Sequence, residues 1–186
     1  MVPVMSLWVP ILGSAVLVFM ASSILHMMLP FHRKDLRKLP NEDEVQDGLR
    51  RFNIPPGDYA LPCAGSPEGM KKPEFIEKMQ KGPVVFMTIS PGRSPSIAKN
   101  LVLWFLYSVL VSFFAAYITG RALPSGASYL AVFRFIGSTA FMGYSLALLQ
   151  NSIWYNRNWG ATLRSMLDGL IYGLLSAGMF GWLWPR

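Results

Sequence analysis

The sequence predicts an all-α membrane protein, a four-transmembrane-helix bundle with a small cytoplasmic α+β insertion between helices 1 and 2. Of its 186 residues, 52% are hydrophobic, and charged residues are absent from three long runs, residues 1–31, 100–120 and 135–156. A fourth uncharged run covers residues 169–185. A helix of about 20 residues, rising about 1.5 Å per residue, crosses a hydrocarbon core of about 30 Å, so each run can supply one span.

The first helix, within residues 1–30, is predicted to be an uncleaved anchor and not a signal peptide. No positive charge precedes its apolar run, whereas Arg33 and Lys34 follow it, which is the reverse of a signal peptide. The insertion then covers residues 31–98. Residues 99–186 are predicted to form a three-helix transmembrane unit, with helices at about 100–120, 129–152 and 164–184.

The distribution of charge predicts the orientation in the membrane. Twelve of the 17 Lys and Arg residues and nine of the ten acidic residues lie between residues 33 and 99. Arg157 and Arg164 fall on the same predicted side, and the opposite side has only Arg121 and Arg186. The positive-inside rule therefore places both termini outside and residues 31–98 in the cytoplasm. The mixed sign of this segment argues against a nucleic-acid partner despite the net charge of +7 and leaves the lipid bilayer as the predicted environment.

The insertion is predicted to contain two short helices and two paired strands. Asn41 followed by Glu44 has the pattern of a capping box that opens the first helix. The second helix begins at Pro73 and ends before Gly82. Residues 84–89 are predicted to form a strand that pairs with the extended stretch around residue 59. The first helix has Val45, Leu49 and Phe52 on one face, and the second is expected to bury Phe75, Ile76 and Met79. Both helices are expected to pack over the strand pair or against the membrane face.

Small residues recur every fourth position along the last helix. They form one face of this helix and comprise Ser165, Gly169, Gly173, Ala177 and Gly181. In lipid, such faces let helix backbones approach closely, which favours helix association. The pattern predicts a packing surface for another helix, from this chain, a second copy or a partner membrane protein.

Ionisable residues within the spans are the candidate functional charges, because a charge in hydrocarbon is costly. Asp168 is expected about 6 Å along its helix from a start near Arg164, at the inner boundary, where it can pair with Arg164 one turn earlier. A proton or ion site at Asp168 is the alternative. Arg134, near the outer end of the third helix, is expected to extend outward along its apolar stem.

The two histidines lie close together in the sequence but show no metal-ligand spacing. His26 is expected to cap the first helix or to reach lipid headgroups, and Pro30 is expected to break the helix between it and His32. We assign no metal, cofactor or catalytic residues. The run Gly143-Tyr144-Ser145 resembles the serine motif of rhomboid-type intramembrane proteases, but the last helix contains no histidine to act as its base.

Several short runs resemble a group of uncharacterised bacterial polytopic membrane proteins of similar length. They are HMMLPFHR (26–33), KLPNED (38–43), LVLWF (101–105), DGLIYG (168–173) and GWLWP (181–185), together with Met70 and the pair Gly82-Pro83. The resemblance covers most of the chain. It implies a bacterial plasma membrane and carries over no site residues.

The sequence has helix faces made of small residues and no recognisable set of catalytic residues. This combination favours a protein that works through packing, as an accessory or assembly subunit or a homo-oligomer. A small transporter or channel that uses Asp168 and Arg134 is the alternative hypothesis. An integral membrane enzyme is the third.

Overall fold

The computed structural model describes residues 1–92 and 96–186. Residues 93–95 of the predicted insertion lie outside the described residues. The chain divides into two compact units. Unit 1 comprises Met1–Arg37 and Ser96–Arg186, and unit 2 comprises Lys38–Pro95.

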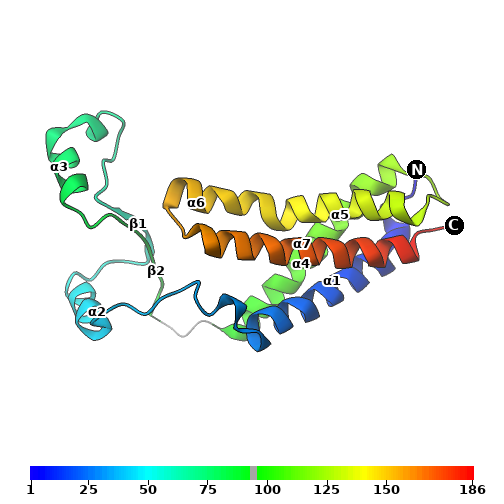
Figure 1. Ribbon diagram of the computed structural model, residues 1–186, viewed down its shortest axis with the longest axis horizontal. Helices are drawn as coiled ribbons and strands as arrows, with labels where there is room; N and C mark the ends of the chain where they lie inside the picture. Colours follow the sequence, from blue (N-terminus) through cyan, green and yellow to red (C-terminus); the bar gives the residue numbers. More distant parts are fainter. Residues whose placement is uncertain (93–95) are drawn as a thin grey trace. The chain divides into compact units, whose positions relative to one another are not determined.

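Unit 1 contains four helices that are long and apolar enough to cross a membrane, as predicted. The first span joins a 3-10 turn (η1, Val4–Leu7), α1 (Trp8–Ser23) and a π-helical turn (η2, Ile24–Met28). The second is α4 (Ile97–Ala122), and the fourth is α7 (Trp159–Leu183). The third joins α5 (Tyr129–Ser145), a 3-10 turn (η5, Leu146–Leu148) and α6 (Leu149–Tyr155). Both termini lie at the same end of this unit (Figure 1).

The helices begin where polar side chains cap them. Ser96, Ser128 and Asn158 each accept a hydrogen bond from a backbone N–H in the first turn of α4, α5 and α7. Such caps satisfy donors that the helix itself cannot. Because Asn158 caps α7, this helix starts at Trp159, earlier than the start near Arg164 that the sequence predicted.

The third span, predicted at about 129–152, is confirmed as residues 129–155, with one irregular turn inside it. The 3-10 turn Leu146–Leu148 separates α5 from α6. At this break the Ser145 hydroxyl donates a hydrogen bond to the Met166 carbonyl of α7 (3.2 Å) and is 1% exposed. Ser145 therefore bonds to backbone and not to a histidine.

The small-residue face of α7 lies against α5, which runs alongside it (Figure 1). A Cβ atom added at Gly173 would lie 3.1 Å from the Gly137 carbonyl oxygen, and one at Gly181 would lie 2.7 Å from the Tyr129 ring. A Cβ atom added at Gly169 would overlap the Ser145 hydroxyl, at 2.0 Å. The backbones of α5 and α7 approach this closely only because side chains are absent there. The partner of this face is thus a helix of the same chain.

Unit 2 contains the predicted pair of strands and two short helices. Strand β1 (Gly57–Leu61) pairs antiparallel with β2 (Val85–Ile89), with Tyr59 opposite Met87. The helices are α2 (Glu42–Arg51) and α3 (Pro73–Lys81), with a 3-10 turn (η4, Gly69–Lys71) before α3.

Two expectations for unit 2 are wrong. Asn41 precedes α2 in a left-handed conformation (φ 52°) and makes no side-chain cap, because a capping side chain needs an extended backbone at that position. The apolar face of α3 is not buried within this unit, since the exposed fraction is 45% for Ile76 and 40% for Met79. Among the described residues of unit 2, only Gly69 is buried. Two strands and two short helices are too few to enclose a core.

Candidate functional site

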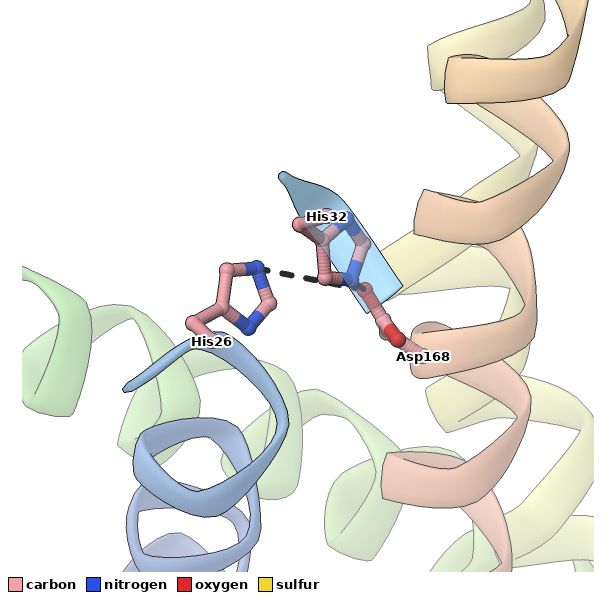
Figure 2. A group of neighbouring side chains, drawn as sticks. All are labelled: His26, His32 and Asp168. Atoms are coloured by element: carbon pink, nitrogen blue, oxygen red, sulfur yellow. Dashed lines mark ion pairs between the residues drawn. The ribbon is translucent and has the colours of Figure 1, made fainter. Parts of the chain in front are cut away.

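A cluster of His26, His32 and Asp168 lies within unit 1, where the first span ends beside α7. Figure 2 shows both imidazole rings turned toward the Asp168 carboxylate. His26 belongs to the π-helical turn, His32 to the 3-10 turn Pro30–His32 (η3), and Asp168 to α7. Leu29 is extended (φ −93°, ψ 142°), as is favoured before proline. The chain turns here, and the two rings stack with centroids 4.4 Å apart and an interplanar angle of 16°.

The nitrogen atoms of the two rings converge on one carboxylate oxygen. His32 Nε2 lies 2.9 Å from Asp168 Oδ2, and His26 Nε2 lies 3.9 Å from the same oxygen. One ligand atom from each of the three residues lies within 4.8 Å of the others. His32 Nε2 and Asp168 Oδ1 are buried without a hydrogen-bond partner among the described residues. The short approach of His32 Nε2 to Asp168 Oδ2 thus leaves both groups available to a further partner.

The other nitrogen of each ring is occupied by a second group. His26 Nδ1 lies 3.2 Å from the Ser22 carbonyl oxygen, and His32 Nδ1 lies 2.7 Å from Asp35 Oδ2. Both acceptors favour a proton on Nδ1, which leaves the Nε2 lone pairs free. Arg164 in turn donates from Nε to Asp35 Oδ1 (2.8 Å), and its Nη2 contacts the same oxygen.

Asp35 is an ionised acceptor in this network. Burial of its carboxylate favours the neutral form, but the hydrogen bonds from His32 and Arg164, together with the charge of the Arg164 guanidinium, outweigh that effect and lower the pKa of Asp35. The carboxylate is thus charged at neutral pH, and it can fix the orientation and the tautomer of His32.

The structure corrects the predicted partner of Asp168. Arg164 bonds to Asp35, and the groups that lie against Asp168 are the two histidines. Because α7 starts at Trp159, Asp168 lies nine residues into the helix, or about 13 Å along its axis, and not about 6 Å. Its side chain is only 3% exposed, compared with 13% for His32 and 52% for His26.

Arg134 is not part of this site. It is exposed on α5 and forms no ion pair with any residue that the structure describes. Its outward extension to the membrane boundary stays a prediction.

An open cavity of about 640 Å³ adjoins the cluster, and His26 and Asp168 form part of its wall. The rest of the wall is mostly apolar and aromatic and includes Met27, Leu101, Trp104, Tyr144, Leu148 and Tyr172. Trp104 Nε1 donates to the Ser22 hydroxyl (2.8 Å) and joins α4 to the first span. The lining comes from all four spans.

The sequence suggested that Pro30 would separate the two histidines, so neither was expected to bind a metal. In the structure, the turn at Pro30 instead stacks the two rings. The spacing of His32 and Asp35 by three residues, within one turn, is the signal that could have indicated an oriented imidazole. Asp168 could not be joined to them by spacing, because it is more than 130 residues away along the chain.

Two imidazoles and one carboxylate form a donor set for a divalent transition metal. Ligand atoms bound to one zinc ion with tetrahedral angles lie about 3.3 Å apart. The distances of 2.9 and 3.9 Å to Asp168 Oδ2 bracket this value. To bring all three ligands to one ion, the ring of His26, the exposed member, would have to turn out of its stack on His32. No family model, curated protein or solved structure matches this chain.

Proposed function

We propose that this integral membrane protein binds one divalent transition metal ion of the zinc class through His26, His32 and Asp168. The observation that carries the proposal is the convergence of both Nε2 atoms on Asp168 Oδ2, while both Nδ1 atoms face carbonyl or carboxylate acceptors. This division of roles between the two ring nitrogens is the one that metal-bound histidines adopt.

The burial of Asp168 supports the proposal. A carboxylate that is 3% exposed within a membrane span can be ionised only beside a compensating charge. Arg164 does not supply it, because its guanidinium binds Asp35. A divalent cation would compensate the carboxylate and would also occupy the lone pair of His32 Nε2.

The two hypotheses that the sequence favoured have less support. The small-residue face of α7 is filled by α5 of the same chain, so it requires no partner or second copy. Transport through one chain would need a path along the bundle. The half of unit 1 near the termini instead contains a packed apolar core around Leu7, Val132 and Phe180.

We place the protein in a bacterial plasma membrane, with both termini outside and residues 31–98 in the cytoplasm. The excess of Lys and Arg on one side of the spans and the resemblance described above support this assignment. On this topology the metal site lies near the cytoplasmic boundary.

Zinc titration of the purified protein, in competition with a chromophoric chelator, tests the proposal. We expect one zinc ion per chain, and we expect the variants His32→Ala and Asp168→Ala to lose at least about tenfold in affinity because each removes a ligand. Asp43→Asn, a charge change at an exposed position of α2, is the matched control and should bind as the wild type does. If folded wild type takes up no zinc, or if both ligand variants bind as tightly as the control, the proposal is wrong.

A further inference from the structure

The cavity and the candidate metal site share a wall. His26 and Asp168 contribute to both, so an ion held by these residues would have one side toward the cavity. Three protein ligands leave at least one coordination position of a zinc-class ion open. A ligand in the cavity can therefore reach the ion.

The charge at the site selects an anionic ligand. Two neutral imidazoles and one carboxylate leave a divalent ion with one net positive charge. Asp35 does not cancel it, because Asp35 is paired with Arg164. A ligand with one negative oxygen donor would make the site neutral, which matters where water is scarce.

The cavity wall also contains a hydroxyl group without a hydrogen-bond partner among the described residues. The Tyr172 hydroxyl, one turn along α7 from Asp168, is buried and has no hydrogen-bond partner among the described residues. An unpaired hydroxyl in an apolar environment is unfavourable. The second oxygen of a carboxylate bound to the ion could accept its hydrogen bond.

The remainder of the wall suits an alkyl chain. Met27, Leu101 and Leu148 line it together with Trp104, and the volume of about 640 Å³ lies in the usual range of ligand pockets. All four of these residues belong to membrane spans.

We infer that the cavity binds a single-chain anionic amphiphile, with its carboxylate-type head on the metal ion and its chain along the apolar wall. This inference rests on the proposed function, because the head is placed by the ion. It adds the ligand class, which the metal site alone does not specify.

Cobalt-substituted protein in nonionic maltoside micelles provides the test, since ligand exchange on Co²⁺ changes its visible absorption. We expect dodecanoate to change the spectrum at a concentration about tenfold or more below that needed for acetate, because its chain is buried in the cavity. The variant Leu101→Trp fills the cavity. It should bind cobalt normally and lose this preference.

The control is Leu106→Trp on the same helix, at a position that is 55% exposed and outside the cavity wall. It should keep the preference, which separates cavity binding from uptake of dodecanoate by the micelle. A cobalt spectrum that dodecanoate and acetate change equally, or a preference that Leu101→Trp does not reduce, would overturn the inference and leave the metal site standing. Folded protein that gives no cobalt spectrum would overturn both.

Discussion

Replacing Asp35 by Asn tests whether the metal site depends on an oriented histidine. Asp35 is not one of the proposed metal ligands. It accepts from His32 Nδ1 at 2.7 Å and from Arg164 Nε at 2.8 Å, so it acts on the ion only through His32. Removal of such outer partners lowers metal affinity about 10- to 100-fold, or about 1.4–2.7 kcal/mol.

The size of the loss in metal affinity depends on how the introduced amide is oriented. If the oxygen of the introduced amide still accepts from His32 Nδ1, only the negative charge is lost, and the smaller decrease is expected. If the amide N–H₂ faces the ring instead, the proton moves to Nε2 and the ligand lone pair is lost. The larger decrease then follows.

Zinc competition titrations of Asp35→Asn, with Asp43→Asn as control, measure the effect, and circular dichroism establishes that both variants are folded. The reasoning fails if Asp35→Asn binds zinc as tightly as the control while His32→Ala does not. Asp35 would then be a structural partner of Arg164 with no influence on the metal.

Three further predictions concern packing and topology. Gly169→Ala should destabilise the protein by about 1–3 kcal/mol, because the new Cβ would overlap the Ser145 hydroxyl on α5. The control is Gly178→Ala, whose new Cβ would lie 3.8 Å from the Tyr129 hydroxyl. It should melt at or above the wild-type temperature in detergent. Ser22→Ala removes the acceptor of the tryptophan hydrogen bond between the first span and α4 and should cost about 0.6–1.7 kcal/mol in a denaturation assay, whereas Ser23→Ala, which loses only a bond within its own helix, should cost less. An impermeant maleimide should label the exposed thiol of Cys63 in inside-out vesicles but not in intact spheroplasts, and the opposite result would reverse the proposed topology.

The sequence predicts the four spans and the strand pair because these depend on local properties. A run of apolar residues long enough to cross the bilayer specifies a helix whatever it packs against, and alternating or β-branched stretches bounded by proline and glycine specify strands. The helix boundaries in the structure differ from the predicted ones where a capping residue or a turn interrupts the pattern. Examples are the start of α7 and the 3-10 turn within the third span.

The cluster of His26, His32 and Asp168 could not be predicted in the same way, because it forms by contact between distant segments. The sequence spacing predicted that Asp168 would pair with Arg164, one turn away on α7. In the structure the Arg164 guanidinium bonds to Asp35 instead, and the histidines lie against Asp168. Pro30 breaks the helix, as its chemistry dictates. The direction of the chain after that break is set by tertiary packing, and this direction brings His32 onto His26.

Zinc K-edge X-ray absorption of the zinc-loaded protein tests the central claim most directly, since it identifies the atoms bound to the metal. Ligation by His26, His32 and Asp168 predicts a first shell of nitrogen and oxygen at about 2.0–2.1 Å with the outer scattering of two imidazoles. A sulfur shell at about 2.3 Å, which only Cys63 or a methionine of this chain could supply, or the absence of imidazole scattering, would contradict it.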